Sequence, residues 1–341
     1  MGGLHLHRLR RRQKWLVVNR ANRYTASSNE IFAATDKVIV VEENQCWADL
    51  GRMGGEQFLS LTWNATVQHY LNSTSEHILS VGSAVHEIGH VLGFFHTMCR
   101  YDRDRYIKLV TQNINLRVIR NFQKISPNYS DVYGLGYDYG SIMHYDDRCD
   151  SVNGGPTIIA TDTNYQKTMG SDLISFSDIF VINEHYGCNA ICNKSTSAKC
   201  ANEGFPHPRN CSICICPSGY GGPLCDKRPP GCGEDLMATN KKKMVNGSVG
   251  FGSDLRDHFD FCNYMISFSI QAPKGKKIVV DLEWVSYGYD RPGCIRGGVE
   301  IKAQKDQKLT GPIVSSVNPL PLILFNRQGT MQTRVTYRYI D

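Results

Sequence analysis

Three histidines and a glutamate lie close together in the segment from His86 to His96. His86 and His90 are four residues apart, so on a helix their imidazoles project from the same side, about one turn apart. Two imidazoles at that spacing can chelate a single metal ion. The alternative is a group of core or surface histidines that binds no metal. We favour a metal site on a helix, because Gly93 and His96 add to the pattern.

Gly93 provides a way for the third histidine to reach the same ion. Glycine readily adopts the left-handed conformation that ends a helix, and the sharp turn would bring His96 back toward the first two histidines. Three neutral imidazoles with an open fourth position are typical of a catalytic zinc site. Glu87 would face a metal-activated water as general base without binding the metal. The next glutamate is Glu184, so a third ligand of that type has almost no candidate.

The hydrophobic pattern predicts the elements that position these side chains. Four apolar residues recur at helical spacing, roughly opposite the first two histidines: Val81, Val85, Ile88 and Leu92. The pattern therefore predicts a helix over Val81–Phe95. Strands are predicted where β-branched residues cluster or alternate, at Val38–Val41, Ile278–Trp284 and Thr333–Ile340.

The chain has 341 residues, of which 41% are hydrophobic and 21% are charged. This length suits two or three domains with sizeable cores. The formal net charge is +6, but four of the 38 basic residues lie in positions 1–12, at Arg8 and Arg10–Arg12. The remaining sequence is nearly balanced, so we expect no nucleic-acid partner. No apolar stretch is long enough for a membrane-spanning helix, so none is expected.

Thirteen cysteines indicate an oxidising compartment, since six of them fall between Cys192 and Cys225. Six possible glycosylation sites agree with a secreted glycoprotein: Asn64, Asn72, Asn128, Asn193, Asn210 and Asn246. No signal peptide is visible at the N-terminus. Residues 1–12 resemble a basic processing segment, with a solvated run of charge as the equal alternative.

Composition divides the rest of the chain into three parts. Residues 13–188 have a mixed α and β pattern. Residues 189–227 are small, polar and rich in cysteine, and a linker at Arg228–Gly231 follows. Residues 231–341 read as an all-β sandwich, with glycines and prolines between short strands.

Three motifs resemble those of the astacin family of metzincin metalloproteases. His86–His96 is similar to the metzincin zinc motif, and Ser141–Tyr145 matches the astacin form of the methionine turn. Arg100–Asp104 resembles the stretch that follows the third histidine in astacins. The overall pattern is similar to nematode astacin-like proteases with EGF-like and CUB domains. This resemblance implies an α+β fold: an astacin-like catalytic domain with a zinc helix, an EGF-like module, and an all-β CUB sandwich.

The resemblance also implies roles for individual residues. One Zn²⁺ per chain would be bound by His86, His90 and His96, with Glu87 as general base. Met143 would form an apolar floor under the zinc, where ordinary core packing is the alternative. Tyr145 would be a phenol that moves between the metal and the transition state, where a surface aromatic is the alternative. Three charged residues are expected to form structural ion pairs rather than to act in catalysis: Asp102, Arg103 and Asp104.

Cysteine count alone leaves fifteen pairings open for the six clustered cysteines. The EGF resemblance implies the pairs Cys192–Cys211, Cys200–Cys214 and Cys216–Cys225, and the CUB resemblance implies Cys232–Cys262. Five cysteines stay unassigned: Cys46, Cys99, Cys149, Cys188 and Cys294. Cys99 and Cys149 form a possible pair, because both follow elements close to the metal site. The region before Cys46 is shorter than the family pattern implies.

The sequence therefore predicts a secreted, extracellular zinc-dependent endopeptidase that hydrolyses peptide bonds of extracellular proteins. Its partners would be a protein or peptide substrate and, through the CUB and EGF modules, an extracellular matrix or protein partner. The equal alternative for these modules is a spacer that stabilises the chain. The alternative for the whole protein is a catalytically impaired adhesion protein that acts through the same modules.

Overall fold

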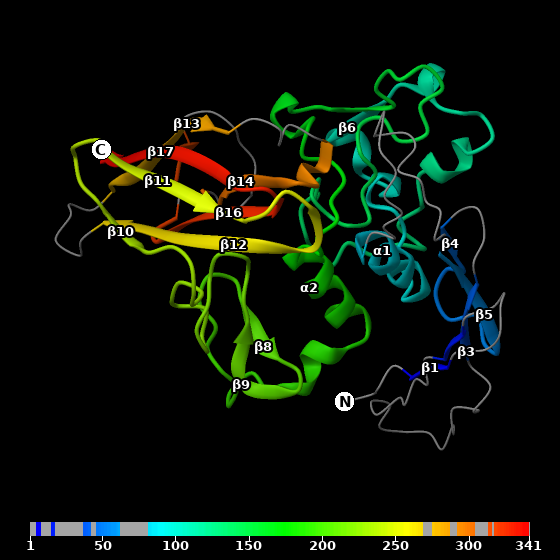
Figure 1. The fold of residues 1–341 in the computed structure, drawn as a ribbon. Helices are drawn as coiled ribbons and strands as arrows, with labels where there is room; N and C mark the ends of the chain where they lie inside the picture. Colours follow the sequence, from blue (N-terminus) through cyan, green and yellow to red (C-terminus); the bar gives the residue numbers. More distant parts are fainter. Residues whose placement is uncertain are drawn as a thin grey trace.

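The structure is a computed structural model. It describes residues 5–7, 15–17, 37–41, 46–61, 81–268, 275–286, 292–303, 313–315 and 317–340. The arginines of the basic segment 1–12 and the sites at Asn64 and Asn72 lie outside these residues. Figure 1 shows three parts: an N-terminal region that contains the helices, a cysteine-rich module with one strand pair, and a C-terminal sandwich of strands.

The N-terminal region combines small sheets with two helices. A three-stranded sheet has the order β3-β5-β4, with bounds Lys37–Val41 for β3, Glu56–Ser60 for β5 and Trp47–Ala48 for β4. The strands β3 and β5 are parallel. Two antiparallel pairs join β1 (His5–His7) to β2 (Trp15–Val17) and β6 (Ile107–Leu109) to β7 (Ile158–Ala160). The strand predicted at Val38–Val41 is confirmed as β3.

The predicted helix is α1, Val81–Val91, which ends four residues earlier than expected. Gly93 has φ +99°, a left-handed conformation that stops the helix as the sequence suggested. The apolar stripe is not the buried face, because Val81 and Ile88 are exposed. The helix packs instead through its glycines, which allow close approach: a Cβ on Gly82 would lie 2.8 Å from Asp172 Cα.

The helix α2, Phe176–His185, begins with a capping box. Ser175 Oγ accepts a hydrogen bond from the Asp178 backbone N–H, and the Asp178 carboxylate accepts one from the Ser175 backbone N–H. Asp178 also accepts hydrogen bonds from Ser141 Oγ, at 2.7 Å, and from the Ile142 backbone N–H. This carboxylate therefore ties α2 to the predicted methionine turn.

Short 3₁₀ helices connect most other elements: Thr97–Cys99, Arg103–Arg105, Thr111–Asn113, Ile119–Phe122, Thr163–Tyr165, Cys188–Ile191 and Pro292–Cys294.

The charges at 100–104 form structural ion pairs, as the sequence suggested. Arg100 Nη2 lies 2.9 Å from Asp102 Oδ2, and Lys124 Nζ lies 2.6 Å from Asp104 Oδ2. Arg103 is buried and donates to Met98 O at 2.8 Å.

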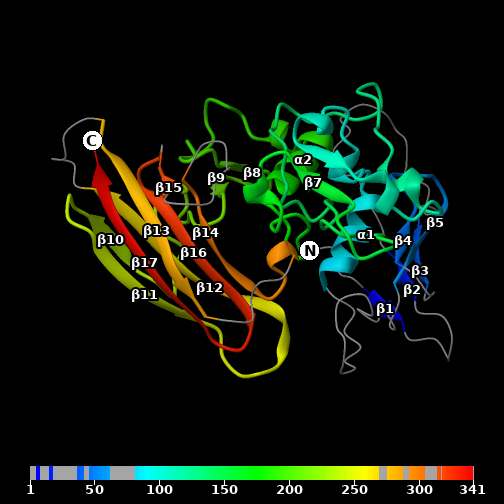
Figure 2. The same ribbon diagram turned by 90° about the horizontal axis from the view of Figure 1, so that it is seen from above.

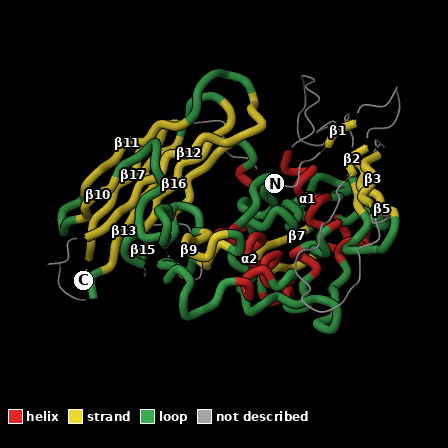
Figure 3. Tube along the Cα trace, turned by 90° about the horizontal axis from the view of Figure 1, so that it is seen from below, coloured by secondary structure: helices red, strands yellow, loops and turns green. Residues whose placement is uncertain are grey.

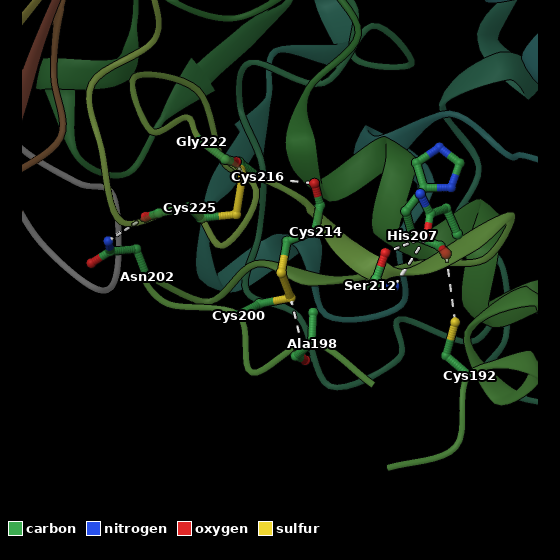
Figure 4. The surroundings of a disulfide bond; sticks show 11 residues. Cys192, Ala198, Cys200, Asn202, His207, Ser212, Cys214, Cys216, Gly222 and Cys225 are labelled. Carbon is green, nitrogen blue, oxygen red and sulfur yellow. Dashed lines mark hydrogen bonds between the residues drawn. A yellow bond between two sulfur atoms is a disulfide. The ribbon is translucent and has the colours of Figure 1, made fainter. Parts of the chain in front are cut away.

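The cysteine-rich module holds one antiparallel pair, β8 (Phe205–His207) and β9 (Asn210–Ile215). One disulfide joins Cys192 to Cys211. Two more, which Figure 4 shows, join Cys200 to Cys214 and Cys216 to Cys225. Cys232–Cys262 is the fourth disulfide. All four pairs agree with those the resemblance implied.

The pair considered for Cys99 and Cys149 is wrong. Both residues are thiols in the structure. Cys99 is buried, and its Sγ lies 2.9 Å from the backbone oxygen of Asn121 as a hydrogen-bond donor. Burial raises the pKa of this thiol to about 11, so it is protonated at neutral pH.

The C-terminal sandwich has two four-stranded sheets, which Figures 2 and 3 show as two layers of strands beside the helix-containing region. One sheet has the order β10-β12-β16-β14, and the other has the order β11-β17-β13-β15. The strand bounds are Asp235–Ala238 (β10), Lys243–Val249 (β11), Leu255–Phe268 (β12), Lys277–Val285 (β13), Gly297–Ile301 (β14), Ile313–Val314 (β15), Leu320–Gln328 (β16) and Met331–Ile340 (β17). The strands predicted within β13 and β17 are confirmed.

The sandwich core lies between the sheets, where alternate residues point inward. Ile278, Leu322 and Leu324 are fully buried there. The cysteine-rich module packs on both neighbours: Phe205 contacts Phe176 of α2, and Tyr220 Oη donates to Pro319 O at 3.1 Å. Among the described residues no helix has the length and apolar character needed to cross a membrane.

Candidate active site

The three histidines of the motif converge on one point. His96 Nε2 lies 3.2 Å from His86 Nε2 and 3.0 Å from His90 Nε2. Ligand nitrogens at tetrahedral angles, about 2.0–2.1 Å from a zinc ion, lie about 3.3 Å apart. The glycine turn therefore places His96 at nearly the spacing that a tetrahedral zinc site requires.

The opposite ring nitrogens fix the orientation of the imidazoles. His86 Nδ1 donates to Ile142 O at 2.7 Å, and His90 Nδ1 donates to Phe94 O at 2.8 Å. With Nδ1 protonated, each neutral ring presents its Nε2 lone pair to the common point. Burial lowers the pKa of all three rings, to about 4 for His90. The chain thus holds three neutral nitrogen donors at neutral pH, which suits a divalent zinc ion.

Glu87 lies on the wall of the same cavity as His86. Only 6% of the residue is exposed, and its Oε2 has no hydrogen-bond partner among the described residues. Burial raises the pKa of this carboxyl to about 7. A buried carboxylate oxygen without a partner next to three converging nitrogens fits a site that binds a metal ion and a polar ligand.

Met143 lies directly against the helix that carries the histidines. A Cβ on Gly89 would lie 2.6 Å from Met143 Sδ, so only glycine allows this contact. Met143 is 1% exposed, and its backbone oxygen accepts a hydrogen bond from the Thr97 N–H at 2.9 Å. The methionine turn thus contacts α1 and also holds the segment that follows His96.

Tyr145 lies beside the third histidine. Its ring centroid is 4.4 Å from that of His96 and 5.5 Å from that of Phe122, with the Phe122 and Tyr145 rings in a T-shaped arrangement. Its hydroxyl interacts with the Asn121 side chain. Burial raises the pKa of the phenol, so Tyr145 is neutral and can donate a hydrogen bond. Tyr145 is partly buried against the core of this region, so the alternative of a surface aromatic ring is wrong.

The cavity beside the histidines has a volume of about 240 Å³. Its lining comes from α1, from the methionine turn, from residues 170–172 and from the C-terminal sandwich. The residues are Cys46, Gly82, Ser83, His86, Glu87, Ile142, His144, Tyr145, Asp146, Cys149, Gly170, Ser171, Asp172 and Ile295. We call it the histidine cavity.

Sequence reasoning did not assign a role to His144, the residue between Met143 and Tyr145. Its Nδ1 donates to Tyr145 O at 2.6 Å, and its Nε2 accepts from Tyr137 Oη at 2.7 Å. Burial lowers its pKa to about 4. Tyr137 belongs to none of the sequence motifs, so no sequence signal indicated its hydrogen bond with His144.

His144 should make the zinc-free protein sensitive to acid. Its pKa in the folded state, about 4, is below its value of about 6.5 in an unfolded chain, so the unfolded state binds more protons between these values. The contribution of neutral His144 to the free energy of unfolding is therefore fully present above pH 6.5 and is lost as the pH decreases toward 4. We expect His144 alone to cost about 2 kcal/mol between pH 7.5 and pH 5. Urea unfolding of the zinc-free wild type and of His144→Gln, followed by near-UV circular dichroism, measures this difference. Parallel pH profiles of the two proteins would contradict it.

Comparison with known proteins identifies the family. The family model described as Astacin, a peptidase family, matches residues 21–187. The zinc metalloproteinase nas-31 of Caenorhabditis elegans is 42% identical over 319 residues, which cover 90% of this chain and 49% of nas-31. The zinc metalloproteinase nas-25 of the same organism is 36% identical over 330 residues, which cover 92% of this chain and 78% of nas-25. This chain belongs to the astacin family.

Zinc is the metal that suits the three-histidine cluster, as in other astacins. The chain spans about half the length of nas-31. A solved structure of high choriolytic enzyme 1, a hatching-enzyme zinc protease from Oryzias latipes, is 31% identical with a TM-score of 0.39. That match covers 48% of this chain and 74% of the solved chain.

Proposed function

We propose that this astacin is a secreted zinc-dependent endopeptidase that hydrolyses peptide bonds of extracellular proteins. The observation that carries the proposal is the convergence of three Nε2 atoms on one point, with the Glu87 carboxyl on the wall of the cavity that His86 also lines. The family and the zinc metalloproteinase relatives support it. The adhesion alternative is not favoured, because all three histidines and Glu87 are in place.

His86, His90 and His96 would hold the zinc ion through Nε2. When bound, zinc polarises the scissile carbonyl and lowers the pKa of water. Glu87 would accept a proton from the attacking water and pass it to the leaving amine. The buried Oε2 of Glu87 has no hydrogen-bond partner among the described residues, so it is available for that proton.

Tyr145 would supply a hydrogen bond to the oxyanion that develops on the carbonyl. As a neutral phenol beside His96, it can donate to that oxygen once its hydroxyl leaves Asn121. Met143 would support the histidines from below through its contact with Gly89.

Removing this hydroxyl should impair the chemical step more than zinc or substrate binding. We expect Tyr145→Phe to lower kcat about 100-fold, the usual cost of one oxyanion donor, with KM changed little. Steady-state kinetics on a fluorogenic peptide measure both parameters. Tyr101→Phe, on an exposed tyrosine, is the matched control and should leave both unchanged. An unchanged kcat in Tyr145→Phe would exclude the donor role.

The disulfide-rich modules support secretion and an extracellular site of action. By their cysteine pattern and two-layer architecture we assign residues 189–227 as EGF-like and the C-terminal sandwich as CUB-like, with protein or matrix recognition as their role. The direct test of the proposed function is hydrolysis of an unfolded protein substrate by the purified chain. Activity should disappear with a chelator and return with zinc, and no cleavage by the zinc-loaded chain would contradict the proposal.

A further inference from the structure

The histidine cavity is not built by the N-terminal region alone. Ile295 lines it together with His86 and Glu87. Ile295 belongs to the C-terminal sandwich, between the turn at Pro292–Cys294 and strand β14, far along the chain from the histidines. In Figure 2 this turn lies at the side of the sandwich that faces α1.

The backbone of Gly293 holds this turn against the N-terminal region. Its N–H donates to Lys167 O at 3.0 Å. Gly293 is buried with φ +69°, and a Cβ at this position would collide with the backbone oxygen of Gly170. A residue other than glycine would therefore hold the two parts further apart.

An ion pair from strand β16, the neighbour of β14 in the sheet, also holds the sandwich against the N-terminal region. Arg327 Nη2 lies 2.6 Å from Asp172 Oδ2, and Arg327 is only 7% exposed. The backbone N–H of Arg327 also donates to Arg296 O at 2.9 Å, so the pair and the Ile295 turn are directly connected. Asp172 in turn packs against Gly82, one helical turn before His86. The sandwich is thus in contact with the segment that positions the first histidine.

The chemistry of the cavity indicates what Ile295 would contact. Its other walls near Asp172 are small or polar, namely Gly82, Ser83 and Ser171. The cavity volume of about 240 Å³ leaves room for one amino-acid side chain. Ile142 and Ile295 are the two aliphatic residues in the described lining, and Ile295 is the one that the sandwich contributes. Its aliphatic surface favours an apolar side chain.

We propose that the C-terminal sandwich forms a wall of the substrate site, and that Ile295 is a specificity-determining residue for an apolar side chain next to the scissile bond. This inference rests on the proposed endopeptidase function. It assigns the sandwich a direct role in substrate choice, in addition to any recognition of distant partners.

Kinetics on a peptide series test the proposal. The peptides share one sequence except for a single residue next to the cleaved bond, which is Leu, Ser or Asp. The varied residue precedes the bond in one set of peptides and follows it in a second set. Ile295→Ala should lower kcat/KM for a Leu peptide about tenfold, mainly through KM. Ile295→Lys should lower kcat/KM for the Leu peptide at least as much. It should raise kcat/KM for the peptide that carries Asp in place of that Leu. Leu282→Lys, on an exposed residue of β13, is the matched control and should leave the preferences unchanged.

Binding separates this inference from the proposed function. The dissociation constants of the same peptides are measured with the zinc-loaded Glu87→Gln chain, with and without Ile295→Lys. A switch from Leu to Asp preference supports the inference even if the wild type does not cleave peptides. If the wild type cleaves peptides and neither Ile295 variant changes a preference, the inference is wrong while the endopeptidase function stands. Unchanged binding preferences in an inactive chain would refute both.

Discussion

Replacing Glu87 by glutamine is expected to lower kcat/KM for peptide hydrolysis by about 10⁴-fold, while the chain keeps its zinc. Glutamine has nearly the same shape as glutamate but cannot accept the proton of the attacking water. Glu87 is buried on the cavity wall and is not one of the three nitrogen donors, so its loss should leave the metal site intact. Steady-state kinetics and elemental analysis of the purified variant measure the two effects.

Glu56→Gln is the matched control for this substitution. Glu56 lies on β5, and its side chain is 53% exposed in an ion pair with Lys37. A surface pair of this kind contributes little to stability, so the control should be as active as the wild type. If Glu87→Gln kept wild-type activity, another group would have to serve as the base. If it lost its zinc, its inactivity would say nothing of proton transfer.

Replacing His96 by alanine should remove both zinc and activity. The third nitrogen lies 3.0–3.2 Å from the other two and completes the donor set, so two imidazoles would remain. Loss of a group that only orients a ligand costs about 10–100-fold in metal affinity, and loss of the ligand itself should cost about 10³-fold or more. Competition with a chromophoric zinc chelator measures the affinity directly.

His258→Ala is the control for the histidine variant, because His258 is exposed on β12 far along the chain from the motif. It should bind zinc as tightly as the wild type. Unchanged zinc affinity in His96→Ala would mean that the ion is bound elsewhere.

Local patterns were sufficient to predict that the three histidines meet at one point, because the interactions involved are local. Two histidines four residues apart share a helix face whatever the rest of the chain does, and a glycine turn needs only its own backbone freedom. The end of α1 was predicted too late, at Phe95 instead of Val91, because the apolar residues continue beyond the turn. The same stripe suggested the wrong packing face, since α1 is buried through Gly82 and Gly89.

Contacts between distant segments needed the structure. Met143 and Tyr145 were found only through the family resemblance, because nothing in their own spacing relates them to α1. The close fit of Met143 to Gly89 depends on tertiary packing, and so does the Tyr137–His144 pair. The disulfides of the cysteine-rich module followed from the resemblance, whereas the Cys99–Cys149 pair, suggested by proximity to the same site, was wrong.

The position of Ile295 could not be predicted at all. The sequence pattern predicts the strands of the sandwich, but it does not predict which side of the sandwich faces the N-terminal region. The contacts of Gly293 with Lys167 and of Arg327 with Asp172 hold this turn at the histidine cavity.

Zinc X-ray absorption spectroscopy on the purified full chain tests the central claim most directly, because it reports the ligands of the ion itself. The account predicts one zinc per chain with three imidazole nitrogens at about 2.0–2.1 Å and an additional oxygen ligand. A spectrum dominated by sulfur, or one with fewer than three imidazoles, would contradict the claim that His86, His90 and His96 bind a single catalytic ion.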